Sequence, residues 1–541
     1  MEPDDRIADH LIGVDVGTGS ARAGVFDATG QLTGTDAAPI DLHRAPDGRI
    51  EQSSTDIWAA VCHAVQGAVA ASGVGAERIG GMGFDATCSL VVLGPDGAPL
   101  AVGDADRPDR DVIVWMDHRA LDQTRRINAG RHRVLDYVGG RMSPEMQTPK
   151  LLWLAENRPD TFAAAWQFFD MTDWLGWRAT GSLARSSCTV TCKWTYLAHE
   201  DRWDESYFHA IGLGALAREG FARIGTEIVA PGTALARGLT DAAAADLGLR
   251  PGTPVGAGLI DAHAGGVGTV GARGGGGAEA NLAYVFGTSS CTMTTTAEPV
   301  FVPGVWGPYL SAMVPGKWLN EGGQSAAGAA IDRLLTFHPH APDATAEARA
   351  AGLSLPAWLA GQCAGRGGAA EALTLATGRH IVPEVLGNRA PHADPDTRAV
   401  IAGIGMRDGL DDLLAQYVAG LCGIGYGLRQ ILGAQADRGI DVARVVLSGG
   451  AGRHPLVRQL LADAANVEVA TAGTEEPVLL GSAILGAVGG GLFPDISAAM
   501  QAMTTFGPVH PPTGGETARR HARRFDIFTR LQSVAREAHG V

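Results

Sequence analysis

Glycines and small hydroxyl residues gather on a turn near the start of the chain. Residues 11–27 (LIGVDVGTGSARAGVFD) predict two β-strands joined by a Gly-Thr-Gly-Ser turn. Because glycine lacks a Cβ, the backbone of such a turn can come close to a ligand, and its N–H groups and hydroxyls can hold phosphate oxygens. One turn of this kind would fit an ordinary β-hairpin equally well. The expected phosphate contacts are Gly17, Thr18, Gly19, Ser20 and Arg22.

A second copy of the pattern lies half a chain later, at residues 282–296 (LAYVFGTSSCTMTTT). Two such turns imply two related lobes that face each other across a cleft, each holding part of a nucleotide's phosphates. The copies differ where Asp15 is matched by Val285, so only the first lobe offers a carboxylate. We expect Asp15 to face a hydrated divalent cation, Mg²⁺, on the phosphates. The second turn is expected to contribute Gly287, Thr288, Ser289 and Ser290.

Asp261 follows an apolar strand predicted at residues 251–259 and precedes a run of small residues. A carboxylate at such a place, in the cleft between the lobes, can take the proton of a sugar hydroxyl that attacks a γ-phosphate. The alternative is a helix N-cap, a role for which Asp is favoured, and spacing alone leaves both open. His263, two residues later, is expected to be a packing or capping residue.

A glycine-rich turn at residues 448–452 (SGGAG) follows a predicted strand and precedes a helix that contains Pro455. Its glycines could let an adenosine lie against the backbone, with a plain strand-to-helix turn as the alternative. The expected contacts are Gly449, Gly450 and Ala451. The chain has no Gly-x₄-Gly-Lys-Ser/Thr loop and no Gly-x-Gly-x-x-Gly after a strand, which disfavours P-loop and dinucleotide-binding proteins.

Short polar islands beside strands and helix starts could bind a polyol, which needs several hydrogen bonds and few charges. Taken singly, each island fits a surface turn or an ion pair better. Together with Asp261 they predict a sugar pocket. The residues are Asp85, Ala86, Thr87, Asp117, Arg119, Lys193 and Glu321.

Composition narrows the class of protein. The 541 residues are 45% hydrophobic and carry a net charge of −15, which favours a soluble acidic protein of more than one domain over a nucleic-acid-binding surface. No apolar run predicts a signal peptide or a membrane span. The seven scattered cysteines suit the reduced thiols of a cytoplasm. Cys188 and Cys192 are four residues apart, but no second pair or His-x-His set completes a zinc site.

Lysine is scarce in this chain, whereas arginine is abundant. Only Lys150, Lys193 and Lys317 are present. A genome that favours arginine codons would explain the scarcity, and the alternative is that a retained lysine acts as a compact donor of three hydrogen bonds, which arginine cannot. Lys317 is expected at the surface.

Strand and helix patterns alternate throughout, so each lobe is expected to be α/β, with helices covering a mixed sheet. Helices are predicted at residues 54–69, capped by Ser53 or Ser54, and at 410–436. Residues 320–325 (NEGGQS) are expected to cap a helix over 326–335, and 338–376 to be an irregular insertion. The Gly-rich residues 272–280 predict a linker, which gives an N-terminal domain at 1–270 and a C-terminal domain at 271–541.

These residues resemble a known family, the FGGY carbohydrate kinases, over about residues 11–491. The two phosphate turns, VGAGLIDAHAGGVG and EMQTPKLLWLAEN carry the resemblance. It is strongest to the pentulose kinases, above all the D-ribulokinase branch, through GFDATCSLVVL, WMDHRA, CKWTY, FVPGVWGPY and LNEGGQS. The resemblance implies a two-lobed actin-like ATPase fold (sugar kinase/Hsp70/actin) with ribonuclease H-like domains and a central cleft. It also implies ATP and Mg²⁺ as cofactors, and sugar contacts at Lys193, Asp261 and Glu321.

The predicted function is therefore ATP-dependent phosphorylation of a pentulose, with D-ribulose as the first candidate. Three alternatives stay open: a kinase for another ketose or polyol (L-ribulose, ribitol, xylulose), a non-catalytic nucleotide-binding regulator, and an actin- or chaperone-like assembly protein. The expected partner is a small sugar, without nucleic acid or membrane. Relatives are often dimers, so a homodimer is included among the expected assemblies.

Overall fold

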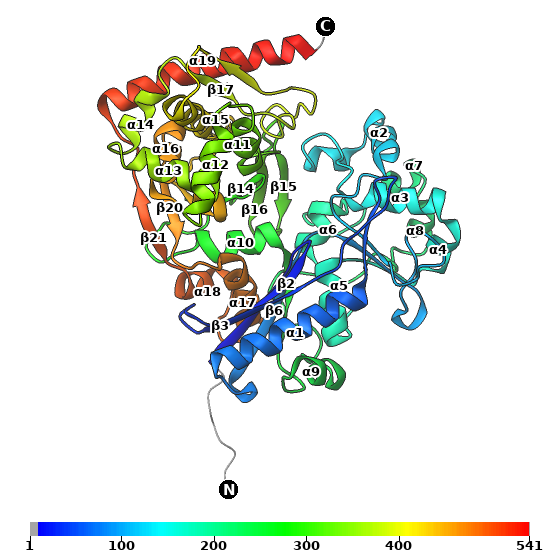
Figure 1. Ribbon diagram of the computed structural model, residues 1–541. Helices are drawn as coiled ribbons and strands as arrows, with labels where there is room; N and C mark the ends of the chain where they lie inside the picture. The colour runs from blue at the N-terminus through cyan, green and yellow to red at the C-terminus, as the bar shows by residue number, and fades with distance from the viewer. Residues whose placement is uncertain (1–8, 540–541) are drawn as a thin grey trace.

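The computed structural model of the chain describes residues 9–539, which form two lobes (Figure 1). The N-terminal lobe is built on a five-stranded sheet of order β12-β6-β1-β2-β3. Strands β1, β2 and β3 are antiparallel neighbours, whereas β6 and β12 run parallel to β1. The strands are β1 (His10–Val16), β2 (Ser20–Asp27), β3 (Leu32–Pro39), β6 (Ile79–Ala86) and β12 (Val255–Ile260).

The C-terminal lobe contains a seven-stranded sheet of order β15-β16-β14-β13-β19-β20-β21. Its central strands repeat the first sheet: β16, β14 and β13 are antiparallel neighbours, and β19 and β20 run parallel to β13. The two-lobe duplication predicted from the turns is thus present in the strand order. The strands are β13 (Asn281–Phe286), β14 (Ser290–Thr296), β15 (Trp306–Leu310), β16 (Trp318–Gln324), β19 (Arg444–Ser448), β20 (Glu468–Ala472) and β21 (Phe506–His510).

A second sheet and several helices complete the N-terminal lobe, and the longest of these helices, α1, packs on β2 and β3. The sheet has the order β4-β5-β8-β7-β9, with β4 (His43–Arg44), β5 (Ile50–Gln52), β7 (Leu90–Leu93), β8 (Val112–Ile113) and β9 (Gln167–Asp170). A short parallel pair joins β10 (Arg185–Ser186) to β11 (Ile228–Val229). The helices are α1 (Ser54–Ser72), α2 (Leu121–Ala129), α3 (Gln147–Asn157), α4 (Pro159–Ala164), α5 (Met171–Thr180), α6 (Ser187–Lys193), α7 (Glu205–Ala210), α8 (Gly214–Arg218) and α9 (Asp241–Leu247).

Helices also cover the C-terminal sheet, and three of them come from the segment expected to be irregular. Residues 338–376 contain α12 (Ala341–Ala350), α13 (Leu355–Ala364) and α14 (Ala369–Leu375). Ser354 caps α13 by accepting a hydrogen bond from the N–H of Ala357. The others are α11 (Gly328–Leu335), α15 (Leu410–Ala436), α16 (Pro455–Ala465) and α19 (Gly515–His539), beside the small pair β17 (His380–Val382) and β18 (Val400–Ala402).

Two helices meet where the lobes join (Figure 1): α10 (Asp261–Val270) and α17 (Pro477–Gly489), with α18 (Ile496–Met503) beside them. Although α17 comes late in the chain, it packs on β1, β6 and β12 of the N-terminal sheet. Glycines bring the backbones into contact. A Cβ on Gly13 would collide with the carbonyl oxygen of Leu479, and one on Gly481 with that of Ala264.

The predicted helix at 410–436 is confirmed, and α1 begins after Ser53 as predicted. The prediction for residues 320–325 is wrong, because 320–324 lie in β16 rather than in a helix cap. They pair with both β14 and β15, and these ladders satisfy the backbone groups that a cap would otherwise serve. No helix within residues 9–539 is long and apolar enough to cross a membrane.

Candidate active site

Three aspartates stand at the carboxyl ends of three adjacent parallel strands. Asp15 of β1 is the register partner of Asp85 on β6, and Asp85 in turn pairs with Leu259 of β12. Asp261 follows β12 directly and begins α10. Since parallel strands end at the same edge of their sheet, the topology gathers carboxylates that are far apart in the sequence.

The environments of these three carboxylates differ. Burial, then the charge of Asp15, raises the pKa of Asp261 to about 6, and the Asp261 carboxylate accepts a 2.7 Å hydrogen bond from the N–H of Ala262. Burial, then Asp15, also raises the pKa of Asp85 well above its usual value. One Asp85 oxygen accepts a 2.5 Å hydrogen bond from the Ser482 hydroxyl of α17, and the other has no partner in the described part of the chain.

Arg22 is the nearest counter-charge on the first turn. It donates to Asp15 at 2.5 and 3.1 Å, and to Glu476, just before α17, at 2.7 Å. Carboxylate oxygens are the ligands that Mg²⁺ prefers, and a cation would reduce the repulsion between these acids. The unpaired oxygen of Asp85 and the carboxylate of Asp15 therefore fit a divalent cation. Arg22 already neutralises part of the charge of Asp15 through its two hydrogen bonds.

Lys193 and Glu321 bring opposite charges from the two lobes, from the end of α6 and the middle of β16. Both are about 6% exposed. Burial alone would raise the pKa of Glu321, but the charge of Lys193, with help from His263, lowers it to about 2. Burial alone would lower the pKa of Lys193, but the charge of Glu321 holds it well above its usual value. Each partner thus favours the ionised form of the other, and charged groups of this kind can orient hydroxyl groups.

Two residues that the sequence analysis missed lie beside this pair. The Lys193 Nζ is 5.2 Å from the centre of the Trp306 ring, and the guanidinium of Arg389 is 5.7 Å from the same ring. Arg389 also helps to lower the pKa of Glu321. Trp306 lies within the FVPGVWGPY stretch, which could have indicated it as a site residue. Arg389 belongs to no sequence pattern that would indicate a site residue.

Asp117 and Arg119 have structural partners. Arg119 donates to Asp117 at 2.7 Å and to Glu51 at 2.8 Å, and Asp117 accepts from the N–H of Ile50 at 2.6 Å. All three charged side chains are at most 4% exposed, which is typical of a network that supports a loop. Their contact with a sugar stays a prediction, as do those of Ala86 and Thr87. The N–H of Thr87 donates to the carbonyl of Val16, which joins the two strand ends.

Both glycine turns are closed by backbone hydrogen bonds. The N–H of Gly17 donates to the carbonyl of Ser20, and that of Gly287 to the carbonyl of Ser289, each at 3.0 Å. Some of the hydroxyls on these turns are already hydrogen-bonded within the protein. Thr18 accepts a hydrogen bond from the Trp115 indole at 2.9 Å, and the buried Ser290 hydroxyl is bound by Gln324. Within residues 9–539, the hydroxyls of Ser20 and Ser289 make no hydrogen bond to another residue.

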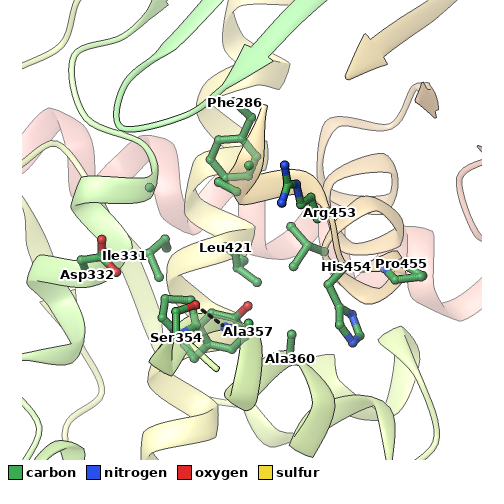
Figure 2. A pocket seen from close by; sticks show the side chains of 16 residues that line it. Phe286, Ile331, Asp332, Ser354, Ala357, Ala360, Leu421, Arg453, His454 and Pro455 are labelled. Atoms are coloured by element: carbon green, nitrogen blue, oxygen red, sulfur yellow. Dashed lines mark hydrogen bonds between the residues drawn. The ribbon is translucent and has the colours of Figure 1, made fainter. Parts of the chain in front are cut away.

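A cavity of about 480 Å³ adjoins the second turn (Figure 2). This volume lies in the range of small-molecule sites. Gly450 and Ala451, both predicted as adenosine contacts, line it, and Phe286, the residue before the second turn, forms one wall. Ala357 of α13 and its N-cap Ser354 form another wall, so the segment predicted as an irregular insertion supplies part of the pocket. Gly449 precedes the cavity at φ +93°, a conformation that favours glycine.

A buried cysteine–histidine cluster lies beside the aspartates, and sequence spacing did not indicate it. His263 Nδ1 is 3.0 Å from the Sγ of Cys188, and Cys192 lies next to them. Burial alone would raise the pKa of Cys188, but Cys192 and the charge of His263 lower it to about 5. Burial alone would lower the pKa of His263, but the charge of Cys188 and its hydrogen bond raise it to about 10. The two cysteines thus do have a third partner, 71 residues beyond Cys192, which sequence spacing cannot reveal.

The three lysines occupy different environments. Lys150 is fully buried, and its Nζ donates to the carbonyls of Val114, Trp115 and Glu145 at 3.1–3.4 Å. The idea that a retained lysine serves as a compact donor of three hydrogen bonds is confirmed there. Lys317 is partly exposed and pairs with Glu279 at 2.5 Å.

Comparisons with known proteins also point to a carbohydrate kinase. Models of the N-terminal and C-terminal domains of the FGGY family of carbohydrate kinases match residues 10–268 and 282–490. An FGGY carbohydrate kinase domain-containing protein of Danio rerio is 44% identical over 98% of both chains. A D-ribulokinase of Saccharomyces cerevisiae is 37% identical over 90% of this chain and 73% of its own length. A xylulose kinase structure from Rhodospirillum rubrum superposes with a TM-score of 0.81 at 20% identity, covering 98% of this chain and all of that one.

Proposed function

This chain belongs to the FGGY family of carbohydrate kinases, a family of two-lobed actin-like fold, and from that premise we propose that it phosphorylates D-ribulose to D-ribulose 5-phosphate with ATP. Membership makes it a sugar kinase and implies the use of ATP. The choice of D-ribulose is supported by the named activity of the yeast relative.

In the proposed mechanism, Asp261 takes the proton of the sugar's terminal hydroxyl as its oxygen attacks the γ-phosphorus in line. The observation that supports this role is the place of Asp261, directly after β12 at the sheet edge that also carries Asp15 and Asp85. Burial and the charge of Asp15 raise the pKa of Asp261 to about 6, and a stronger base is better suited to remove a hydroxyl proton. Lys193 and Glu321 orient the sugar through hydrogen bonds to its other hydroxyls. Their ionised state in a buried setting makes those bonds charge-assisted.

The nucleotide is assigned to the two glycine turns and the 480 Å³ cavity. The turns Gly17–Ser20 and Gly287–Ser290 would hold the phosphates through hydroxyls and through backbone N–H groups other than those of Gly17 and Gly287, which close the turns. Gly449, Gly450 and Ala451 would face the adenosine. Asp15 would hold Mg²⁺ through water. When bound, Mg²⁺ offsets the charge of the phosphates. Closure of the lobes would exclude water, which otherwise competes with the sugar for the phosphoryl group. A homodimer and a cytoplasmic location stay sequence-based expectations.

The test is a substrate screen of the purified full chain with ATP and Mg²⁺, in which ADP release is coupled to NADH oxidation. D-ribulose should give the highest kcat/KM among D-ribulose, L-ribulose, D-xylulose and ribitol, and the product should carry phosphate on O5. A clear preference for ribitol or D-xylulose would overturn the substrate. ATP hydrolysis insensitive to every sugar would favour an assembly protein, and binding of ATP without turnover would favour a regulator.

A further inference from the structure

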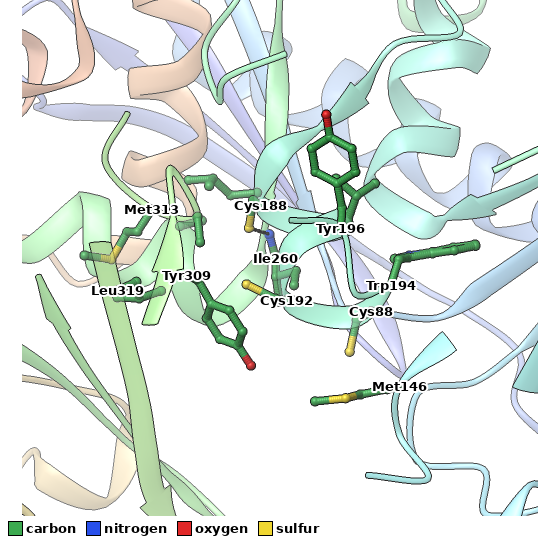
Figure 3. Close-up of a cluster of buried hydrophobic side chains, with 14 of the residues drawn as sticks. Cys88, Met146, Cys188, Cys192, Trp194, Tyr196, Ile260, Tyr309, Met313 and Leu319 are labelled. Carbon is green, nitrogen blue, oxygen red and sulfur yellow. Dashed lines mark hydrogen bonds between the residues drawn. The ribbon is translucent and has the colours of Figure 1, made fainter. Parts of the chain in front are cut away.

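Three potential metal ligands meet in the interior between α6 and α10. Cys188 and Cys192 are one turn apart on α6 and therefore project from the same side of that helix. His263 is the third residue of α10. The two sulfur atoms and a ring nitrogen of His263 all lie within 4.8 Å of one another, and each residue is at most 1% exposed. Figure 3 shows both cysteine sulfurs close to Ile260, at the end of β12.

The donor types and their spacing match one class of cation. Two cysteine sulfurs and an imidazole nitrogen form a set that binds Zn²⁺, whereas Mg²⁺ selects oxygen ligands. A tetrahedral Zn²⁺ with bonds of about 2.0–2.3 Å holds its ligand atoms about 3.5–3.8 Å apart. These values fall within the range that the structure allows. Cys188 Sγ and His263 Nδ1 are 3.0 Å apart, and no two of the three ligand atoms are more than 4.8 Å apart. Ligation therefore needs shifts of about 1 Å or less, which side-chain rotation can supply.

A second, independent observation concerns the far side of the imidazole. The Nε2 of His263 lies 3.6 Å from Oε2 of Glu321, and neither atom has a hydrogen-bond partner among residues 9–539. Both atoms are completely buried, where an unpaired polar atom is costly. A metal on Nδ1 would fix the tautomer with its proton on Nε2, facing Glu321. Histidine ligands commonly donate their other ring N–H to a carboxylate in this way, which orients the ring and raises its basicity.

The surroundings also stabilise a thiolate. The N–H of Ile260 points at Cys188 Sγ from 3.4 Å, and a backbone donor of this kind lowers the cost of holding negative charge on sulfur. All seven cysteines of the chain are free, so neither Cys188 nor Cys192 is committed to a disulfide.

We propose that Cys188, Cys192 and His263 form a binding site for one thiophilic divalent cation, Zn²⁺ being the ion that best matches the donor set, separate from the magnesium position at Asp15. Binding releases two protons, one shared by Cys188 and His263 and one from Cys192, and involves no oxidation or reduction. Water fills the fourth coordination position. The proposal does not depend on which sugar the protein phosphorylates.

Cobalt is the probe of choice, because Co²⁺ occupies zinc sites and gives a thiolate charge-transfer absorption in the near ultraviolet, whereas Zn²⁺ is silent. The reduced full chain, in buffer with excess Mg²⁺, should bind one Co²⁺ per chain with this absorption, and an equivalent of Zn²⁺ should abolish it. Cys192→Ser and His263→Gln should each weaken Co²⁺ binding at least tenfold. The matched controls are Cys363→Ser and Cys422→Ser, because these thiols are equally buried but lie in the other lobe, the C-terminal one.

Absence of the charge-transfer band in the unaltered chain would overturn the proposal, and so would a band of equal strength in Cys192→Ser. Equal losses in the two control variants would also overturn it, because the ion would then be held elsewhere. Thermal unfolding of each variant without metal separates loss of ligands from loss of fold. The readout is spectroscopic, so an inactive protein that binds Co²⁺ would contradict the proposed kinase function and leave the metal site standing.

Discussion

Replacement of Asp261 by asparagine should separate the chemical role of this carboxylate from its cost to the fold. Asparagine has the same shape and can still accept the hydrogen bond from Ala262 N–H that the carboxylate accepts at 2.7 Å. It cannot take a proton. General-base catalysis is typically worth a factor of about 10²–10⁴ in rate, so kcat should fall by that factor, or by about 3–5 kcal/mol of barrier.

The same substitution should make the protein more stable. The pKa of Asp261 is raised from 3.8 to about 6 by burial and by Asp15. A carboxylate whose pKa is raised by folding opposes the folded state once it is ionised, here by up to about 3 kcal/mol above pH 6. Asp261→Asn removes this charge from the three-aspartate edge. We therefore expect a higher apparent melting temperature together with the loss of turnover.

The assay pairs ADP release, in the presence of D-ribulose, with thermal unfolding and with ATP binding measured by tryptophan fluorescence. Affinity for ATP should stay within about threefold, since Asp261 is not among the residues assigned to the nucleotide. Asp241→Asn is the matched control, because Asp241 also begins a helix, α9, but is exposed and distant. Near-normal kcat in Asp261→Asn, or a fall in kcat accompanied by lower stability, would refute the reasoning.

Three further predictions concern other parts of the molecule. Lys193→Met leaves buried Glu321 without its main counter-charge, so it should lower the free energy of unfolding by about 3 kcal/mol, and adding Glu321→Gln should restore part of this loss in urea denaturation. Gly13→Ala would force a Cβ against the Leu479 carbonyl oxygen, and should give misfolded protein by circular dichroism and gel filtration; a native elution profile would contradict this. Burial raises the pKa of Asp111 from 3.8 to about 7, so the wild type should lose about 2–3 kcal/mol of stability relative to Asp111→Asn between pH 5 and pH 8, and a constant difference would disprove it.

Local patterns predicted those parts of the fold that depend on neighbouring residues. The two Gly-Thr-x-Ser turns predicted a duplicated lobe, and the strand order of the two sheets repeats accordingly. The apolar strand before Asp261 predicted a carboxylate at a strand end, and β12 ends at Ile260. Helix α15 has the predicted bounds because its apolar residues recur at helical spacing over many turns.

The failures concern contacts between distant segments. Residues 320–325 look like a helix cap by composition, but the ladders to β14 and β15 decide their structure. The bond from Ser482 to Asp85 spans 397 residues, and the approach of His263 to Cys188 spans 75. Neither leaves a periodic signal in the chain. The helices of residues 338–376 were missed because alanines and glycines there give little contrast between buried and exposed faces.

The packing of α17 bears on how this protein could be divided or recombined. Its leucines belong to the same buried cluster as Leu11 of β1 and Leu259 of β12, so the interior of the first half is completed by a helix from the second half of the chain. A fragment that stops at residue 270 would leave that sheet face bare, and the remaining fragment would carry an unpaired apolar helix. Hybrids with a relative would therefore have to exchange α17 together with the sheet it covers, keeping glycine at positions 13 and 481, where one backbone rests directly on another.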